Sequence, residues 1–334
     1  MKYHLGVDVG SVSTNIVVLD DAAEVVEALY LRAHGDPLGS VRSGLERAAA
    51  ALPAGATVSS AGVTGSARHL IGAMVDADVV KNEITAHAVA ATHFHPDAAT
   101  VIEIGGQDSK IILLRNGIVA DFAMNNVCAA GTGSFLDQQA TRLGIPIEDF
   151  GRRALESRTE VRIAGRCTVF AESDMVHKQQ LGCAVNDILR GLCSALVRNY
   201  FSSVGKGKEI RQPVVFQGGV AANAGIRRAF AEHLGKEPVV PKHFGVMGAV
   251  GAAILAKDHV AKTGGATRFK GFGIARSDFR TGSVECRDCP NACEVVVFRQ
   301  DGRVIAMFGD RCGKHADAKA SAASRLTGDP GGVE

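Results

Sequence analysis

The sequence has no tryptophan and only 5% aromatic residues, so its core must be built mainly from alanine, valine, leucine and isoleucine. Apolar residues make up 46% of its 334 residues, which is enough for a sizeable core and suggests two or three domains. The formal net charge is only +2 and the charges are mixed along the chain. The sequence therefore has no cluster of basic residues of the kind that binds nucleic acid or a membrane surface, and we expect the protein to bind neither.

Long apolar segments are not evident in the sequence either. No apolar run reaches the roughly 18 residues that a membrane span needs. Asp8 interrupts the first short apolar run, which argues against a signal peptide. We therefore expect a cytoplasmic protein, in which the eight cysteines are metal ligands, reactive thiols or small core residues rather than disulfides.

Two hairpins of the same design are the most informative feature of the organisation. In each, a strand that carries a carboxylate leads into a glycine turn with hydroxyl groups, and a second strand follows. The expected strands are residues 3–9, 15–19, 100–104 and 110–114. This internal repeat predicts two related α/β lobes that face one another.

The remaining pattern is that of alternating helices and strands with a separate C-terminal module. Expected helices are residues 39–51, 83–94, 134–143, 168–181, 183–203, 223–234 and 246–257, and further strands are 57–63 and 213–217. We expect a first lobe (1–95), a second lobe (96–260), a linker (261–283), a cysteine module (284–315) and a flexible tail (316–334).

The two glycine turns are candidate phosphate-binding loops, although neither is a Walker loop. Glycine lets the backbone approach an anion closely, and turn amides with hydroxyls can hold it. Asp8 and Glu103 stand at strand positions where apolar residues are expected, and two such carboxylates suit a hydrated Mg²⁺ on ATP. Gln107 can orient the attacking water. A single loop of this kind would read as an ordinary hairpin, but two in tandem favour the nucleotide interpretation.

The residues assigned to this nucleotide site come from three segments of the chain. The segment FQGGVAANAGIRRAF supplies a strand that ends in two glycines before a helix, which suits a flat adenosine against the backbone. The expected phosphate contacts are Gly10, Ser11, Ser13, Thr14, Gly105 and Gly106, and the expected adenosine contacts are Gly218, Gly219 and Asn223.

Two cysteines stand where helices begin, in NNVCAAGTGSFLD and GRCTVFAESDMV. Cys128 precedes a helix start near Ser134, across a turn whose Gly131 and Gly133 are candidate cofactor contacts, and Cys167 precedes a helix capped by Thr168. A helix N-terminus favours a thiolate and any anionic cluster bound to it. A [4Fe–4S] cluster needs four thiolates, which two chains could supply in pairs. A buried structural role or a catalytic nucleophile stays open for both thiols.

Four further cysteines surround a short hairpin near the C-terminus. Cys286, Cys289, Cys293 and Cys312 flank EVVVFRQDGRVIAMF, which turns at Asp301-Gly302. They predict either a second [4Fe–4S] cluster or a Zn²⁺ site, with His315 able to replace one ligand. An empty site is the third alternative. Cys183 and Cys193 have apolar helical neighbours, and we expect both to be core residues.

Taken together, the motifs resemble a known family. The order of loops resembles the actin, hexokinase and heat-shock ATPase superfold. GVDVGSVSTNIVVL, VTGSAR, NEITAHAVAA, EIGGQDSK and the two cysteine motifs resemble the BadF/BadG/BcrA/BcrD ATPase family over about residues 3–257. Within it, the similarity is to activators of 2-hydroxyacyl-CoA dehydratases and ATP-driven subunits of benzoyl-CoA reductase. Glu103 departs from this pattern, where aspartate is expected.

The resemblance implies a specific activity and specific partners. It implies a homodimer with one [4Fe–4S] cluster bridged by Cys128 and Cys167 of both chains. ATP hydrolysis would drive single electrons, received from a ferredoxin or flavodoxin, to an acyl-CoA dehydratase or aryl-CoA reductase component. Two alternatives stay open: a sugar-type kinase of the same fold, and a nucleotide-regulated assembly module with a zinc knuckle.

Overall fold

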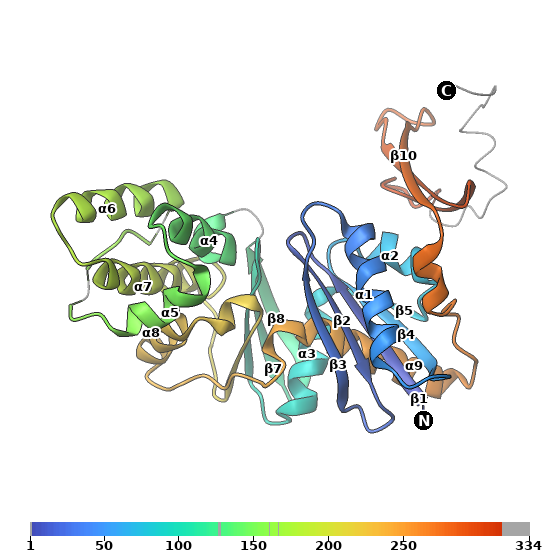
Figure 1. Ribbon diagram of the computed structural model, residues 1–334, viewed down its shortest axis with the longest axis horizontal. Coiled ribbons are helices and arrows are strands. Elements are labelled where there is room, and N and C mark those ends of the chain that lie inside the picture. The colour runs from blue at the N-terminus through green and yellow to red at the C-terminus, as the bar shows by residue number, and fades with distance from the viewer. Residues whose placement is uncertain (1, 126–127, 160, 166, 316–334) are drawn as a thin grey trace. The chain divides into compact units, whose positions relative to one another are not determined.

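The computed structural model describes residues 2–125, 128–159, 161–165 and 167–315, so the expected tail 316–334 lies outside the described residues. The chain divides into two compact units (Figure 1). The described part of the first unit comprises residues 2–10, 14–82 and 252–315, and the second comprises 11–13 and 83–251. Helix α3 (Glu83–Phe94) has the bounds expected from the sequence but belongs to the second unit, whereas a boundary at residue 95 would place it in the first.

The first unit is built on a five-stranded sheet within the described residues, in the order β3-β2-β1-β4-β5. The strands are β1 (Lys2–Val9), β2 (Ser13–Leu19), β3 (Val25–Arg32), β4 (Thr57–Thr64) and β5 (Val79–Val80). Strand β1 pairs antiparallel with β2, which confirms the first hairpin, and parallel with β4. Both β1 and β2 are almost entirely buried, as expected for strands covered on both faces. Helices α1 (Pro37–Ala51) and α2 (Arg68–Val75) contribute to the same hydrophobic core.

The second unit combines a four-stranded sheet with a group of helices, counted over its described part. The strand order is β8-β7-β6-β9, with β6 (Thr100–Ile104), β7 (Ser109–Arg115), β8 (Ile118–Asn125) and β9 (Val214–Gln217). The hairpin between β6 and β7 is confirmed. The helices are α4 (Gly133–Arg142), α5 (Ile147–Leu155), α6 (Thr168–Gln180), α7 (Val185–Ser203) and α8 (Ala224–Leu234). Buried side chains of α7 join these helices to the sheet in one hydrophobic core.

Helix α9 (Met247–Thr263) extends beyond the expected end at residue 257. Together with the preceding 3₁₀ turn, Phe244–Thr263 is long and apolar enough to cross a membrane by length and composition, contrary to the expectation from the sequence. Within the protein, 56% of this window is buried. Gly251 in this helix lies directly against the backbone of Ala86. A Cβ atom at Gly62 would lie 2.0 Å from the carbonyl oxygen of Ala252, so β4 and α9 approach very closely.

The C-terminal segment forms a three-stranded antiparallel sheet in the described residues (Figure 1). Its strands are β10 (Phe279–Glu285), β11 (Glu294–Gln300) and β12 (Arg303–Phe308). The expected hairpin turn at Asp301-Gly302 is confirmed, and both residues have positive φ angles. Phe298 of β11 is fully buried in the core of the first unit, which attaches the sheet to that unit.

We predict that Gly251→Ala destabilises the protein by about 1–3 kcal/mol, the usual cost of overpacking. A Cβ atom at this position would lie 1.8 Å from the carbonyl oxygen of Ala86, which is backbone and cannot rotate away. Urea-induced unfolding measures the change. Gly273→Ala is the control, since no heavy atom lies within 4 Å of the added Cβ. An unfolding free energy of Gly251→Ala equal to that of the control would contradict this packing.

Candidate nucleotide site and paired thiols

The first candidate phosphate loop follows a row of polar side chains in the first unit. Asp8 of β1 pairs in register with Asn15 of β2 and with Thr64 of β4, so the three side chains lie on one face of the sheet. The buried Asn15 Oδ1 and Thr64 Oγ1 have no hydrogen-bond partner among the described residues. Buried oxygen atoms beside a carboxylate are a donor set that suits Mg²⁺ or its bound water.

The residues of this loop differ in exposure. Ser11 is exposed, and Gly10 and Ser13 are half-buried, so these three residues retain access to solvent. Thr14 is fully buried, and its Oγ1 lies 2.6 Å from the Ser40 hydroxyl on α1. Its hydroxyl therefore already has a protein partner.

The VTGSAR motif supports the end of β1. Gly65 has a φ of +96°, and a Cβ atom there would lie 2.4 Å from the carbonyl oxygen of Val9. Only glycine fits this close approach, which places the motif directly against the strand that carries Asp8.

A buried lysine organises the carboxylates behind the second candidate loop. Lys110 Nζ lies 2.9 Å from Glu103, 2.8 Å from Asp108 and 2.8 Å from Glu83. Burial raises the pKa of Glu103 to about 8, against the opposing effect of Lys110. Burial alone would lower the pKa of Lys110, but the three carboxylates raise it above its usual value. One ammonium thus faces three carboxylates, which leaves negative charge beside the loop.

Two glycine turns meet at the same edge of the second sheet. Strands β6 and β9 are parallel, with Glu103 opposite Gln217, so the turn at Gly105-Gly106 and the turn at Gly218-Gly219 leave neighbouring strands at their carboxyl ends. This edge is where open α/β sheets commonly bind ligands. Gly218 has a φ of +91°, and a Cβ atom there would lie 2.4 Å from the carbonyl oxygen of Ile104. The turn therefore requires glycine.

The other residues assigned to this edge have clear structural surroundings. Gln107 is exposed at the tip of its loop. Asn223 caps α8, where its side-chain oxygen accepts a hydrogen bond from the Ile226 amide at 3.1 Å. The guanidinium of Arg227 stacks over the ring of Phe244 at 5.5 Å.

The start of helix α4 is bonded directly to the second loop. The amide of Gly133 donates to the carbonyl oxygen of Gly105 at 2.9 Å, and the amide of Ser134 donates to that of Gly106 at 2.8 Å. The Ser134 hydroxyl donates to the same Gly106 oxygen at 2.6 Å. These bonds satisfy amides that a helix start normally leaves free. A displacement of the Gly105-Gly106 backbone is therefore transmitted to α4.

The two glycines between Cys128 and α4 are also packed closely. A Cβ atom at Gly131 would lie 2.8 Å from Asn199 Oδ1, and one at Gly133 would lie 3.0 Å from the Gly105 carbonyl oxygen. In the structure these glycines allow close packing, and their expected role as cofactor contacts stays a prediction.

Both candidate cluster cysteines occupy helix caps with extended backbone. Cys128 caps the 3₁₀ turn Ala129–Gly131 that precedes α4, and its amide and carbonyl are both bonded to the side chain of Asn125. Cys167, rather than the expected Thr168, is the cap of α6. Neither sulfur forms a capping hydrogen bond, and both cysteines are half-buried. Residues 126, 127 and 166 of the two motifs lie outside the described residues.

The helices that follow these cysteines are held together by polar contacts. Arg142 of α4 forms an ion pair of 2.5 Å with Glu172 of α6, and Gln138 of α4 donates to the same carboxylate. Figure 1 shows α4 beside α6 in the second unit. The two thiol-bearing segments therefore belong to connected helices.

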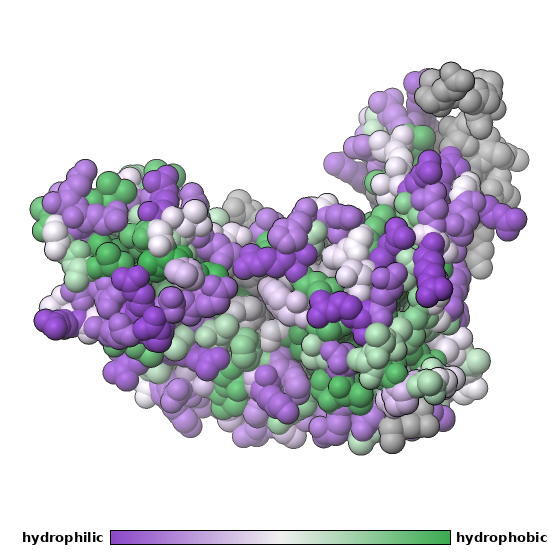
Figure 2. Space-filling view, in the orientation of Figure 1, coloured by the Kyte–Doolittle hydropathy of each residue, from purple (hydrophilic) through white to green (hydrophobic). Residues whose placement is uncertain are grey.

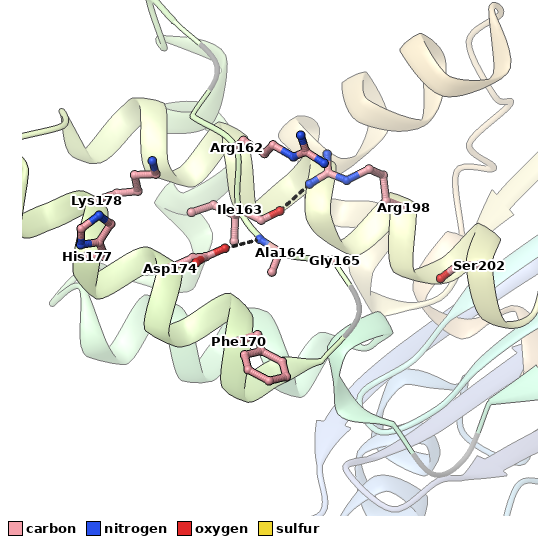
Figure 3. Close-up of a pocket in the computed structure, with 10 residues that line it drawn as sticks. All are labelled: Arg162, Ile163, Ala164, Gly165, Phe170, Asp174, His177, Lys178, Arg198 and Ser202. Carbon is pink, nitrogen blue, oxygen red and sulfur yellow. Dashed lines mark hydrogen bonds between the residues drawn. The ribbon is translucent and has the colours of Figure 1, made fainter.

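A pocket of about 630 Å³ lies at the segment before Cys167 (Figure 3). Arg198 of α7 donates to the carbonyl oxygen of Ile163, and the Ala164 amide donates to Asp174 of α6, so both helices hold this segment in place. Beside it, the first turn of α6 exposes Val169 at 67% and Phe170 at 65%. Figure 2 shows hydrophobic residues interspersed with hydrophilic ones over the region where α6 lies in Figure 1.

The remaining cysteines fall into two groups. Cys193 is buried in the core, as expected, and burial raises the pKa of its thiol to about 12. Cys183 is half-buried and packs against the same core. In the C-terminal sheet, Cys286 is buried, Cys293 is half-buried, and Cys289 and Cys312 are exposed. Among the described residues, potential ligand atoms there gather at Cys286, Asp288 and His315, so the expected set of four thiols stays a prediction.

A comparison with known families covers most of the chain. Residues 5–256 match the BadF/BadG/BcrA/BcrD ATPase family. The chain belongs to this family. The match ends before β10, so the C-terminal sheet lies outside it.

Relatives of known activity include both kinds of protein that the sequence motifs suggest. The (R)-2-hydroxyglutaryl-CoA dehydratase activating ATPase of Acidaminococcus fermentans is 34% identical over 78% of this chain and 99% of its own length. A component of the benzoyl-CoA reductase of Thauera aromatica is 27% identical over 51% of this chain and 63% of its own length.

A solved structure confirms the fold. The activator of the 2-hydroxyisocaproyl-CoA dehydratase from Clostridium difficile, with bound ADPNP, superposes with a TM-score of 0.73 at 32% identity. The superposition covers 78% of this chain and 97% of that protein. The family match confirms the expectation of an ATPase, and the superposition shows that the chain shares the α/β fold of this activator.

Sequence reasoning missed two residues that organise the site. Lys110 lies in the strand KIILL, where its position opposite Glu103 in the hairpin was the signal that could have revealed it. Asn125 precedes Cys128 by three residues, a spacing at which an amide side chain can bond local backbone.

We predict that Lys110→Met destabilises the protein by about 3–5 kcal/mol at pH 8, because buried carboxylates lose their counter-charge. Without the ammonium, the pKa of Glu103 rises further. A raised carboxyl pKa favours the folded state at low pH, and this stability is lost as the pH rises through the folded pKa. The loss of unfolding free energy relative to wild type should therefore be smaller at pH 5 than at pH 8. Urea unfolding at both pH values measures it.

Lys208→Met is the matched control for this experiment. Lys208 pairs with Asp121, which is 53% exposed, and ion pairs at the surface contribute little to stability. The control should show little dependence on pH between 5 and 8. A Lys110→Met deficit that is equal at both pH values would refute the proposed charge balance.

Proposed function

We propose that this protein is an ATP-dependent activator that transfers single low-potential electrons to an acyl-CoA dehydratase or aryl-CoA reductase component. The observation that carries the proposal is the bonding of α4 to the second glycine loop through Gly133 and Ser134. It gives a physical route by which events at a phosphate can reach the helix that follows Cys128. Relatives named as dehydratase activators support the same function.

Mg²⁺-ATP is the proposed nucleotide. Asp8 with the unpartnered oxygens of Asn15 and Thr64 provides a donor set for the hydrated metal ion. Glu103 is the proposed second carboxylate of the site, though its raised pKa and its contact with Lys110 limit its role as a direct ligand. Ser11, Ser13 and the amides of both loops are proposed phosphate contacts, and Gln107, which is exposed, is proposed to orient water.

Cys128 and Cys167 are the proposed ligands of a [4Fe–4S] cluster shared by two chains. When bound, such a cluster supplies one-electron transfer at low potential. The fit rests on the donor chemistry: both residues are thiols at helix caps, and neither sulfur is used as a capping acceptor. Asn125 fixes the Cys128 peptide, and the cap position of Cys167 favours the anionic form of a bound group.

The exposed apolar start of α6 supports a homodimer. Val169 and Phe170 follow Cys167 immediately, and large exposed apolar side chains next to a ligand residue suit burial against a second copy. A chain with two thiols requires that copy to complete four ligands. We place the protein in the cytoplasm, with a ferredoxin or flavodoxin as its reductant.

We predict about four irons per dimer, bound to Cys128 and Cys167, in protein purified without oxygen. Cys167→Ser should lose this iron while still binding ATP, because the nucleotide loops are separate from the thiol. Iron analysis and ATP-binding calorimetry on the same preparation measure both properties.

Cys183→Ser is the matched control, since Cys183 is a half-buried cysteine of the same unit and packs against its core. It should keep both iron and ATP. If Cys167→Ser retains all the iron, the ligand assignment is wrong. If the wild-type protein purified without oxygen contains no iron, the proposed electron-transfer function is wrong.

A further inference from the structure

The C-terminal sheet brings two short cysteine-containing loops to one of its ends. Glu285 at the end of β10 pairs with Glu294 at the start of β11, and Val296 pairs with Phe308 at the end of β12. The loop 286–293 and the loop 309–315 therefore leave the sheet at the same end. The first carries Cys286, Cys289 and Cys293, and the second carries Cys312 and His315.

One residue from each loop already lies at the spacing of metal ligands. Cys286 Sγ is 3.4 Å from His315 Nε2, and both residues are buried, at 5% and 3% exposure. With bonds of about 2.3 Å to sulfur and about 2.0 Å to nitrogen, a tetrahedral zinc ion separates two such atoms by about 3.5 Å. In a [4Fe–4S] cubane each iron takes one protein ligand, so ligand atoms lie farther apart. The observed spacing therefore favours a single ion.

The spacing along the chain repeats in the two loops. Cys286-x₂-Cys289 and Cys312-x₂-His315 form two pairs of the kind that bind structural zinc. In the first loop, the Ala292 amide donates a hydrogen bond to the Cys289 carbonyl oxygen. In the second loop, Gly313 has a φ of +72°, which allows a tight backbone turn between Cys312 and His315. Asp310 accepts a hydrogen bond from the His315 amide at 2.9 Å and lies 3.7 Å from Cys312 Sγ, so one carboxylate orders both members of that pair.

Cys293 has a different environment from these residues. It is half-buried and packs against the small core of Cys286, Val295, Val297 and Met307. Its carbonyl oxygen accepts a hydrogen bond from the Cys286 amide at 2.8 Å, which continues the pairing of β10 with β11 by one more residue. Asp288, although near Cys286 and His315, forms an ion pair with Lys314. Neither residue is needed to complete four ligands.

We propose that Cys286, Cys289, Cys312 and His315 bind one Zn²⁺ that closes the end of the C-terminal sheet. This set replaces Cys293 of the four-thiol pattern with His315. Three thiolates and one imidazole form a closed structural site, which fixes the two loops and leaves no open position for catalysis. The site is independent of the function proposed above, because the sheet lies outside the family match.

The test measures zinc in the full chain with Cys128→Ser and Cys167→Ser, so that cluster thiols contribute nothing. We expect about one zinc per chain, with three sulfur ligands and one nitrogen ligand by X-ray absorption. Adding His315→Ala should reduce zinc at least tenfold, whereas Cys293→Ser should leave it unchanged. His315→Cys should keep zinc with four sulfur ligands, which shows that the loss in His315→Ala comes from the ligand and not from misfolding.

Three results would overturn the proposal. Loss of zinc in Cys293→Ser with retention in His315→Ala would restore the four-thiol set. Iron and sulfide in the double-serine protein would identify a second iron–sulfur cluster. If the full-length protein contains no zinc after expression in zinc-supplemented medium, the Cys286–His315 contact is only a hydrogen bond and no zinc site exists.

Discussion

The bonds between helix α4 and the Gly105-Gly106 backbone are the constraint on which the account of this protein depends. Two backbone amides and one hydroxyl of α4 donate to carbonyl oxygens of a loop that follows strand β6. A helix start of this kind cannot keep its position if the loop backbone rotates. The Gly105-Gly106 loop and the start of α4, which follows Cys128 in the chain, are thereby joined directly by hydrogen bonds of 2.6–2.9 Å.

The buried charges behind this loop make its position costly to change. Lys110 holds Glu83, Glu103 and Asp108 at once, and those carboxylates come from α3, β6 and the loop itself. The hydroxyl of Tyr200 on α7 donates to the carbonyl oxygen of Lys110, which connects the same point to the helical core. The strand edge, the loop and the central helix therefore form one connected network around a single ammonium.

Local sequence patterns were enough to predict much of the fold. The two hairpins have regular alternation into glycine turns, and α3 has its expected bounds. Strand β3, helix α2 and helix α5 were missed, since β3 is an edge strand and the two helices are only eight and nine residues long. The division into units was also beyond local patterns, since α9 returns the chain to the first unit.

The candidate site shows a similar limit. The glycines and cysteines could be recognised in the sequence, because a strand or helix of ordinary geometry does not require these residue types at those positions. The partners of those residues were harder to identify: hairpin register and local spacing gave only weak signals for Lys110 and Asn125, and Asn199 is brought near Gly131 only by the fold. Nothing in the sequence indicated that the Thr14 hydroxyl, an expected phosphate contact, lies 2.6 Å from that of Ser40 on α1, and its role at the phosphate stays a prediction. In the C-terminal loops, the sequence pointed to His315 as an alternative ligand, but only the structure shows its contact with Cys286.

Hydrogen–deuterium exchange at the amides of Gly133 and Ser134 tests the central claim most directly. We expect their exchange rates to differ between the Mg²⁺-ADP complex and the complex with a non-hydrolysable ATP analogue, while the amide of Leu192, in the interior of α7, exchanges equally slowly in both. Equal rates at Gly133 and Ser134 in the two complexes, with both nucleotides shown to be bound, would contradict the account.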